Sequence, residues 1–380
     1  MKILILGADG YLGWSMTASL AKDNHELILV DNYSKRKYME DLKRKPLYKM
    51  PLVPQRLKNL KKTNKKIIFY KTDCSDYKKM KAIITKHKPD AVIHFAELPS
   101  APFSMLNNKY GWETLQNNLQ STFNLIHCIK DIIPDCHIIK LGTMGEYGTP
   151  NIDIEEGWLN INHNNRKDKF LYPRQGSSLY HMSKIMDTDL IWFYVRNYDL
   201  NVTDLMQGPV YGIYHDEFEK DDILAPTFTY DDIFGTVLNR FIVQAVAETP
   251  LTVYGSGAQI RGYINVVDTI KCIKLTLKNR PQNGELAIYN QFTEQFSVRQ
   301  LAQLVIKSLK AININATISN IANPRIEKEK HYYNAKNSNI EKLGLKPLKL
   351  SPKVIIDIAK YVNKHKDRID KRIIKPKVNW

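Results

Sequence analysis

Tyr180 and Lys184 are four residues apart in a stretch of helical composition, so their side chains should share one face of a helix. The ammonium of a lysine lowers the pKa of a nearby phenol, and a phenolate can remove a proton from a substrate hydroxyl. Thr143 follows an apolar run typical of a strand, and its hydroxyl could hydrogen-bond the same substrate oxygen. Because Tyr-x-x-x-Lys also occurs by chance, this assignment depends on the rest of the chain.

A glycine-rich turn, GADGYLG at residues 7–13, directly follows the first apolar strand and opens a helix. Such a turn lets the backbone approach a pyrophosphate, and the N-terminus of the helix supplies N–H groups and a partial positive charge. Asp31 ends the second strand, where a carboxylate can accept hydrogen bonds from both ribose hydroxyls. A carboxylate repels a 2′-phosphate, which favours NAD over NADP, although Lys35 and Arg36 could meet such a phosphate.

The elements that must position these residues alternate along the first half of the chain. We expect strands at 2–6, 26–30, 66–70, 91–95, 137–141 and 202–206, and helices at about 11–20, 115–130 and 179–198. This alternation predicts an α/β fold with a doubly wound parallel sheet of the Rossmann type, with ligands at the C-terminal ends of the strands. Residues 151–176 are polar and are predicted to form a loop.

Two lobes are predicted from the length and from this order of elements. We assign residues 1–208, with returning segments within about 235–283, to the NAD-binding domain. Residues 209–234 and about 284–380 are assigned mainly to a smaller, mixed α/β substrate-binding lobe.

Composition narrows the class of protein. The formal net charge is +17, concentrated at residues 35–66 and 364–377, and suits anionic small molecules. Aromatic residues do not alternate with these basic runs, so we expect no nucleic-acid partner. No apolar run approaches the roughly 20 residues of a membrane span, and no signal peptide is evident, so a cytoplasmic enzyme is expected. The four cysteines have no zinc-like spacing, which predicts reduced core thiols and no metal site.

Further cofactor contacts are predicted at strand ends. Asp73 could contact the adenine edge, Ala96 would let the backbone pass close to the cofactor, and Asn118 is a polar candidate on the next helix. The predicted cofactor-binding residues are Gly7, Gly10, Tyr11, Leu12, Gly13, Asp31, Asn32, Asp73, Ala96, Asn118, Tyr180 and Lys184.

In this order, the glycine turn, Asp31, Thr143 and the Tyr180–Lys184 pair resemble the extended short-chain dehydrogenase/reductase superfamily, many members of which act on nucleotide sugars. Longer stretches resemble one branch of it, the UDP-sulfoquinovose synthases, over nearly the whole chain. These stretches are residues 140–157, 234–236, 238–241, 250–255, 290–297, 329 and 331–335.

The resemblance implies that UDP-glucose and sulfite are the substrates and that the protein is a homodimer formed through a helix pair. Bound NAD would oxidise C4 of the glucosyl unit, the C5 proton and C6 hydroxyl would be lost, sulfite would add at C6, and C4 would be reduced again. Two alternatives stay open: another nucleotide-sugar 4-epimerase or dehydratase, and a non-catalytic NAD-binding regulator. The latter is disfavoured by the intact Thr143, Tyr180 and Lys184.

One departure from related sugar 4,6-dehydratases affects the elimination step. Those enzymes have an Asp-Glu pair after the threonine, whereas Met144 and Gly145 stand here. His181, next to Tyr180, is our candidate acid/base, because an imidazole can give or accept a proton near neutrality. Glu146 is the second candidate.

The substrate side is inferred largely from the resemblance. Arg261 and Arg325 suit bidentate binding of a diphosphate, and the stretch from Thr252 to Tyr254 should flank the uracil. Pro209 replaces an asparagine found in many relatives, and Pro99 replaces a basic residue, so no sulfite contact is assigned there. The predicted substrate-binding residues are Thr143, Gln175, Gln207, Thr252, Tyr254, Arg261 and Arg325.

Overall fold

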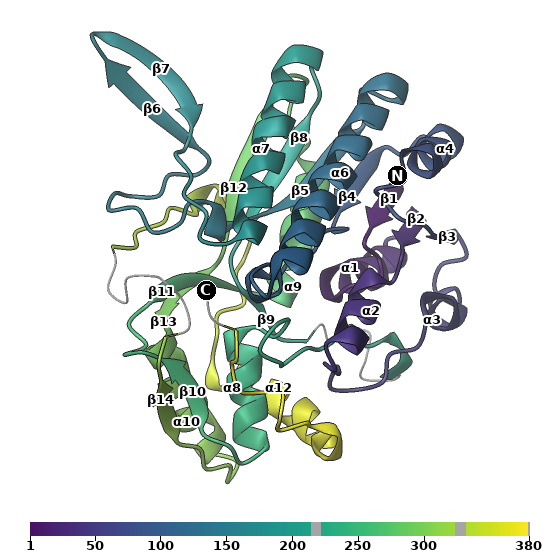
Figure 1. Cartoon of the computed structure of the whole chain (residues 1–380). Helices are drawn as coiled ribbons and strands as arrows, with labels where there is room; N and C mark the ends of the chain where they lie inside the picture. Colours follow the sequence, from purple (N-terminus) through teal and green to yellow (C-terminus); the bar gives the residue numbers. More distant parts are fainter. Residues whose placement is uncertain (214–221, 324–331, 379–380) are drawn as a thin grey trace.

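A seven-stranded parallel sheet forms the centre of the protein, in a computed structural model that describes residues 1–213, 222–323 and 332–378 (Figure 1). The strand order is β12-β8-β5-β4-β1-β2-β3. The strands are β1 (Lys2–Leu6), β2 (Glu26–Asp31), β3 (Ile67–Lys71), β4 (Ala91–His94), β5 (His137–Thr143), β8 (Val202–Gln207) and β12 (Leu286–Gln291). The predicted doubly wound α/β fold is confirmed.

Helices cover both faces of this sheet, as the apolar residues of β1 require. Ile3 and Ile5 belong to the core beneath α1 (Tyr11–Lys22) and α9 (Val266–Lys278). Leu4 and Leu6 belong to the opposite core, with α4 (Tyr77–His87), α6 (Asn108–Ile132) and α7 (Leu179–Tyr198). A strand buried on both faces is continuously apolar, which is the pattern that predicted a parallel sheet.

A smaller lobe lies below the sheet in Figure 1. Its strands form two small sheets: β10 (Leu251–Tyr254) pairs with β14 (Ile318–Ile321), and β11 (Ile260–Asn265) pairs with β9 (Val210–Tyr211) and β13 (Glu294–Ser297). Three helices, α8 (Val237–Val246), α10 (Val298–Lys310) and α12 (Pro352–Lys364), pack together beside them. The remaining helical segments are α2 (Ser34–Asp41), α3 (Val53–Leu60), α5 (Ala101–Ser104), α11 (Ser338–Lys342) and three short turns, η1 (Met144–Glu146), η2 (Asp222–Leu224) and η3 (Lys366–Arg368).

The chain crosses between the lobes more often than we predicted. β12 is an edge strand of the central sheet and pairs with β8, although its residues were assigned mainly to the smaller lobe. In the opposite direction, α8 and β10 lie in the smaller lobe, within a range from which segments were expected to return to the sheet. The exact division into domains therefore stays a prediction.

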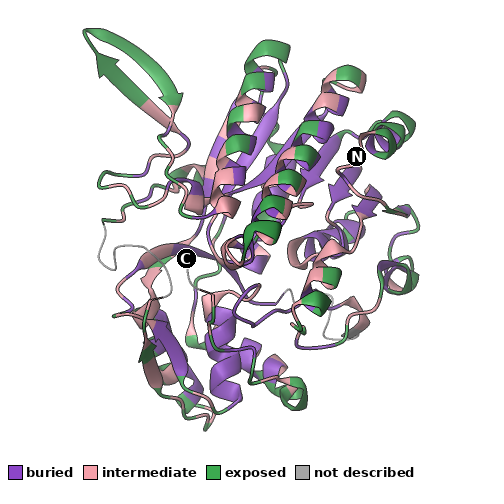
Figure 2. Cartoon of the chain, in the orientation of Figure 1, coloured by how far each residue is buried: buried purple, intermediate pink, exposed green. Residues whose placement is uncertain are grey.

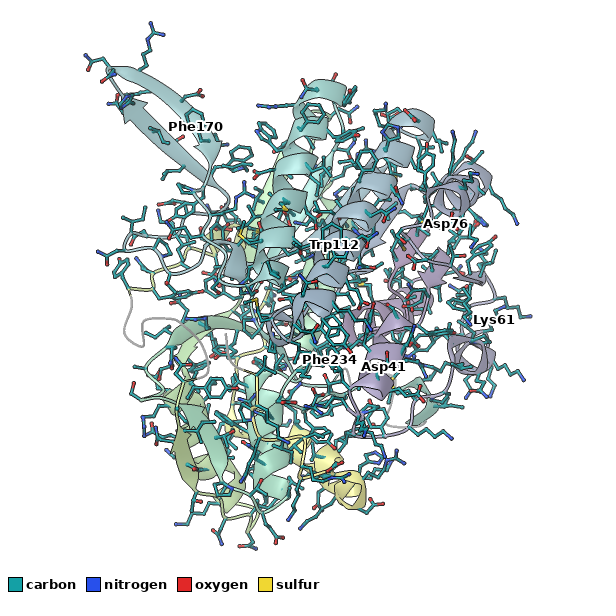
Figure 3. The ribbon with its side chains drawn as sticks, in the orientation of Figure 1. Asp41, Lys61, Asp76, Trp112, Phe170 and Phe234 are labelled. Atoms are coloured by element: carbon teal, nitrogen blue, oxygen red, sulfur yellow. The ribbon has the colours of Figure 1, made fainter. Side chains whose placement is uncertain are left out.

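The polar stretch at 151–176, predicted as a loop, contains a projecting hairpin. β6 (Trp158–His163) and β7 (Arg166–Leu171) pair antiparallel, and their exposed strands extend away from the body (Figure 2). Asn164 and Asn165 at the turn both have positive φ, 49° and 63°, as a tight hairpin turn requires. Figure 3 shows Phe170 on this hairpin, clear of the sheet. The prediction failed because the hairpin buries almost no apolar face.

A connecting loop at residues 225–236 is fastened from two sides. Phe228 O accepts a hydrogen bond from Leu47 N at 2.9 Å, and Asp232 accepts one from Arg44 Nε at 2.8 Å. On its other side, the Asp232 N–H donates to Ile373 O at 3.1 Å. Arg368 Nε also reaches Leu47 O at 3.1 Å. Segments far apart in the sequence therefore position this loop.

Among the helices of the described residues, none is long and apolar enough to cross a membrane. All four cysteines are buried and free, as predicted. Nowhere in 1–213, 222–323 and 332–378 do His, Cys, Asp and Glu side chains gather in a group that could hold a metal ion.

Candidate active site

A cavity of about 780 Å³ opens at the C-terminal ends of the central strands and continues into the smaller lobe. Most of the predicted site residues line it, although they come from many separate segments. They are Gly7, Gly10, Tyr11, Leu12, Gly13, Asp31, Asn32, Asp73, Ala96, Thr143, Gln175, Tyr180, His181, Lys184, Gln207, Thr252, Tyr254 and Arg261. Asn118 and Glu146 are not part of the wall, and Arg325 lies outside the described residues.

The glycine turn brings β1 and the start of α1 into close contact. Gly7 has φ of +80°, and a Cβ there would lie 2.6 Å from the Phe95 carbonyl carbon. A Cβ on Gly13 would lie 2.0 Å from Gly7 O. Neither position tolerates a side chain, and the space in front of the turn belongs to the cavity. The open N-terminus of α1 therefore faces a volume that fits the pyrophosphate of a dinucleotide.

Asp31 is held in one orientation at the end of β2. Its Oδ2 accepts the Asp9 N–H at 2.8 Å, and its Oδ1 accepts the Tyr33 N–H at 2.7 Å. Burial, followed by the nearby carboxylate of Asp9, raises the pKa of Asp31 to about 6. Beside it, Asn32 Nδ2 donates to Asp73 Oδ2 at 2.8 Å. This arrangement presents a fixed acceptor for ribose hydroxyls.

Arg36, one of the two cations considered as partners of a 2′-phosphate, is bound to other protein groups. Its Nε and Nη2 donate to the two carboxylate oxygens of Asp9 at 2.5 and 2.7 Å. Its Nη1 donates to Met50 O at 2.8 Å, and its Nη2 also donates to Pro51 O at 2.7 Å. The guanidinium is thus neutralised by Asp9, and the surroundings of Asp31 fit NAD rather than NADP.

Tyr180 and Thr143 meet where α7 begins and β5 ends. The Ser178 side chain caps α7 by accepting the His181 N–H at 3.2 Å, and the Tyr180 N–H donates to Ser104 Oγ at 3.1 Å. Burial raises the pKa of the Tyr180 phenol, and the negative charge of Glu97 raises it further, whereas a hydrogen bond with Thr143 lowers it. The two hydroxyls are therefore in contact with each other, and the predicted hydrogen bond from Thr143 to a substrate oxygen stays a prediction.

Lys184 has a partner that sequence reasoning missed. Its Nζ donates to Leu141 O at 2.5 Å and forms a short ion pair with the Glu97 carboxylate. Glu97 lines the cavity and also lies 3.5 Å from His94 Nε2 through its Oε1. Its position directly after Ala96, at the C-terminal end of β4, was the available signal, because polar side chains at that edge of a parallel sheet face the ligand.

Glu146 is not placed for our second predicted role, direct acid/base catalysis. It is fully buried behind the cavity, where its Oε1 accepts the Thr143 N–H at 3.3 Å and its Oε2 accepts the Thr188 hydroxyl at 3.1 Å. Lys140 and Arg174 lie 3.8 and 3.6 Å from its carboxylate. Burial raises its pKa above the usual range for a glutamate. Since it cannot touch a substrate, Glu146 acts as a support for Thr143.

His181 lies in the cavity wall, as predicted, and its ring centroid is 5.3 Å from that of Tyr180. Its Nδ1 is 3.1 Å from Ser177 Oγ. A Cβ on Gly145 would lie only 2.3 Å from His181 Nε2. The imidazole therefore occupies the space that a side chain at position 145 would need. His181 can adopt this position only because residue 145 is a glycine.

Asn118 has a packing role instead of the predicted cofactor contact. It is fully buried, and its Oδ1 accepts the Leu98 N–H at 2.8 Å. Its Nδ2 donates to Ser183 Oγ at 2.9 Å, which joins α6 to α7. The neighbouring Asn117 lines the cavity instead. Its place on the inner face of a long helix explains the burial, and this orientation was not evident from the sequence.

In the smaller lobe, the cavity wall contains polar groups whose partners are missing among the described residues. These are Arg240 Nε, Thr236 Oγ1 and both amide atoms of Gln259. Arg240 lies on α8 with its guanidinium 5.5 Å from the Tyr254 ring centroid, and Thr236 is the N-cap of that helix. Buried polar groups are normally hydrogen-bonded, so these atoms are available to a ligand that enters the cavity. An arginine inside the mostly apolar sequence VLNRFIVQAV was the signal that we missed.

Comparisons with known proteins agree with this geometry. The model of the NAD dependent epimerase/dehydratase family matches residues 3–290. Over the whole chain, the sequence is 42% identical to the chloroplastic UDP-sulfoquinovose synthase of Spinacia oleracea, covering 79% of it. It is 40% identical to the UDP-sulfoquinovose synthase of Sulfolobus acidocaldarius, covering all of this chain and 98% of that protein.

Solved structures show the same fold at lower sequence identity. The UDP-glucose 4-epimerase from Bifidobacterium longum in complex with NAD+ and UDP superposes with a TM-score of 0.70 at 21% identity, covering 99% of this chain and all of that one. The UDP-glucuronic acid 4-epimerase from Bacillus cereus, in complex with UDP-glucuronic acid and NAD, gives 0.69 at 20% identity, with 96% and 99% covered.

Proposed function

The chain belongs to the NAD-dependent epimerase/dehydratase family and, within it, to the UDP-sulfoquinovose synthases; on that premise we propose that it joins sulfite to C6 of UDP-glucose. The observation that carries the proposal is the place of His181, which fills the space left by Gly145 beside Tyr180. A proton-transfer group therefore stands where related dehydratases have a carboxylate pair, next to the residues that oxidise the sugar.

NAD is the cofactor of this family, and the cavity residues are arranged to bind it. The turn at residues 7–13 would receive the pyrophosphate, Asp31 would accept hydrogen bonds from the adenosine ribose, and Lys184, which also lines the cavity, would bind the second ribose. When bound, NAD supplies the acceptor and later the donor of hydride for C4. Tyr180 takes the proton of the C4 hydroxyl and later returns it, and Thr143 hydrogen-bonds that oxygen.

The C4 ketone acidifies the C5–H bond, and we assign the removal of this proton to His181. Its imidazole accepts the C5 proton and delivers a proton to the departing C6 hydroxyl, so that water leaves. The sulfur lone pair of sulfite then attacks C6 of the resulting enone, C5 regains a proton, and C4 is reduced. Sulfite and UDP-glucose thus give the 6-sulfonate and water, with no net oxidation of the sugar.

The smaller lobe is arranged for the UDP moiety. The N-terminus of α8 and the guanidinium groups of Arg240 and Arg261 place positive charge on the cavity wall, where a diphosphate can bind. Thr252 and Tyr254 line the same region, and Gln207 is fixed there by donating to Gln291 Oε1 at 2.7 Å. Gln175 lines the cavity too, while Arg325 keeps its predicted role in diphosphate binding without a described position.

A homodimer through α6 and α7 is part of the proposal. These helices lie side by side over one face of the sheet (Figure 1). Their outer surfaces carry Trp112, Phe123, Met186 and Phe193 as exposed apolar residues, and Trp112, labelled in Figure 3, is 62% exposed. An apolar face of this kind is typical of a subunit interface. Sedimentation of a Trp112→Glu/Phe193→Glu variant as a monomer, against a dimer for the parent, would support it.

Mass spectrometry of the products from UDP-glucose, with and without sulfite, tests the activity. We expect the 6-sulfonate with sulfite present, and deuterium uptake at C5 from heavy water without it. Accumulation of the C4 epimer would instead identify an epimerase, and release of a 4-keto-6-deoxy sugar would identify a dehydratase. Absence of any conversion by NAD-loaded protein would favour the non-catalytic alternative. Tyr180→Phe is the matched control, because it lacks only the reacting hydroxyl.

A further inference from the structure

A compact group of buried charges lies at the wall of the cavity and behind it, and the mechanism above uses only part of it. Lys184 and Glu97, whose side chains are 4% and 3% exposed, form a direct ion pair. Asp187, one turn further along α7, is fully buried, and its carboxyl is close enough to Glu97 for their charges to interact strongly. An ion pair so shielded from water exerts a strong local field.

We propose that Glu97 is a positioning residue for Lys184: its carboxylate holds the ammonium against Leu141 O and limits how much of that positive charge acts on the phenol of Tyr180. The inference rests on the proposed function only in so far as Tyr180 carries the proton of the C4 hydroxyl. Under this proposal, Glu97 sets how strongly the phenol of Tyr180 holds the proton that it takes from the C4 hydroxyl.

The charged groups around this pair come from every neighbouring element. They are His94 on β4, Lys140 on β5, Glu146 on η1, Arg174 before α7, Asp187 on α7 and Asp204 on β8, with His181 beside Tyr180. The buried carboxyl groups outnumber the lysine and arginine side chains by one once Glu97 and Lys184 are counted and the exposed Asp189, which also pairs with Arg174, is left out. At least one carboxyl therefore needs a proton for the group to be neutral.

Asp187 is the carboxyl that takes this proton. Burial raises its pKa well above the usual range, and the charge of Glu97 raises it further. The charges of Lys140 and Lys184 and a hydrogen bond with Thr122 lower this pKa, but they do not offset the effects of burial and Glu97. Glu97, by contrast, has the ammonium of Lys184 in direct contact. We therefore treat Asp187 as the neutral carboxyl of the group.

This arrangement suits a reaction whose intermediates persist as ketones. The proton that leaves the C4 oxygen goes to Tyr180 and must stay there during elimination and sulfite addition, until C4 is reduced and the oxygen takes it back. The charge of Glu97 increases the proton affinity of Tyr180. By holding the ammonium of Lys184, Glu97 should also weaken the opposite effect of that positive charge on the phenol. Without Glu97, the phenol would lose its proton to solvent more readily.

The experiment compares Glu97→Gln with Asp187→Asn in the NAD-loaded protein. The first readout is NMR of labelled tyrosine, followed through the ring carbon that bears the phenol oxygen. Since the chain has 21 tyrosines, Tyr180→Phe identifies the signal. The second readout is the pH dependence of cofactor reduction after UDP-glucose is added. Glu248→Gln, which removes an exposed carboxylate paired with Lys366, is the control.

Glu97→Gln should shift the titration of Tyr180 to lower pH by roughly one unit or more, and should shift the alkaline-rising limb of cofactor reduction in the same direction. Asp187→Asn should leave both near the parent values, because it replaces a neutral group by another neutral group. A parent-like titration in Glu97→Gln would overturn the proposal, even if activity were lost. So would an equal shift in Asp187→Asn.

A variant that keeps the charge covers the case in which Glu97→Gln does not fold. Glu97→Asp shortens the side chain and withdraws its carboxylate from Lys184, so its titration should lie below that of the parent. A titration at or above the parent value would refute the assignment. The NMR readout needs no sugar substrate; a protein that forms no sulfonated product would therefore disprove the proposed function without deciding the role of Glu97.

Discussion

The affinity for NAD should depend on pH through a single carboxylate, Asp31. Its pKa is raised to about 6, chiefly by burial and then by Asp9, while its oxygens face the cavity with only two backbone N–H donors. Ribose hydroxyls must donate to the ionised form. Protonation of Asp31 therefore competes with cofactor binding, and binding weakens as the pH falls through about 6.

The size of the effect follows from this pKa. One unit below it, roughly a tenth of the Asp31 carboxyl is ionised, so the Kd for NAD should rise about tenfold for each pH unit below 6. Asp31→Asn replaces a charged acceptor by a neutral one and should weaken NAD binding by about 1.5–3 kcal/mol in total, which corresponds to a loss of roughly 10- to 100-fold at neutral pH. The variant should also lose the pH dependence and discriminate less against NADP.

Calorimetric titration of NAD and NADP into NAD-free protein, between about pH 5 and 8, measures both effects. The parent protein should bind NAD more weakly at the acid end and should hardly bind NADP, because Arg36 is bound to Asp9 and cannot neutralise a 2′-phosphate. Constant affinity across this range, or an Asp31→Asn variant that binds NAD as tightly as the parent, would refute the reasoning. Stoichiometric NADP in the purified protein would do so as well.

Tyr180→Phe should abolish cofactor reduction by UDP-glucose while the thermal unfolding midpoint stays unchanged; undiminished reduction would remove the phenol from the mechanism. Gly13→Ala places a Cβ 2.0 Å from Gly7 O, so we expect a loss of about 1–3 kcal/mol in denaturant unfolding together with loss of bound NAD, and parent-like retention would contradict the close packing. Lys140→Met leaves the buried carboxylate of Asp204 without its lysine and that of Glu146 with Arg174 alone, and should cost about 3–5 kcal/mol, with a larger loss at alkaline than at acidic pH because protonation relieves the repulsion. His181→Ala should still reduce the cofactor but lose deuterium exchange at C5, with overall turnover down by roughly 100-fold; exchange at the parent rate would transfer the elimination step to another residue.

The strands and helices that were predicted well from the sequence are those whose own residues determine which type of element they form. β1, β2 and α7 are examples, because a continuous apolar run, or a long capped segment without glycine or proline, carries the whole signal. The hairpin β6–β7 was missed because its residues face solvent and its stability comes from the turn and the pairing. β12 was misassigned because only its pairing with β8 places it in the central sheet.

For the site, residue type and order along the chain were enough to predict Thr143, Tyr180 and Lys184, because the parallel sheet brings strand ends to one edge. The direction of a side chain was not predictable in the same way. Glu146 lies one helical turn from Thr143 in the sequence, yet its carboxylate is enclosed by Lys140 and Arg174 behind the wall. Such enclosure depends on partners from distant strands and loops, which a single sequence does not reveal.

The fastening of the 225–236 loop has a consequence for how the protein is made. This loop contributes Asp232, Phe234 and Thr236 to the cavity wall, but it is held in place by Ile373, far downstream. During translation, the glycine turn and Asp31 leave the ribosome long before residue 373 does. A nascent chain can therefore form the glycine turn and the Asp31 site early, but the loop that closes the cavity takes its place only late. We expect NAD that binds before that stage to dissociate quickly, and to dissociate slowly once the segment around residue 373 has docked.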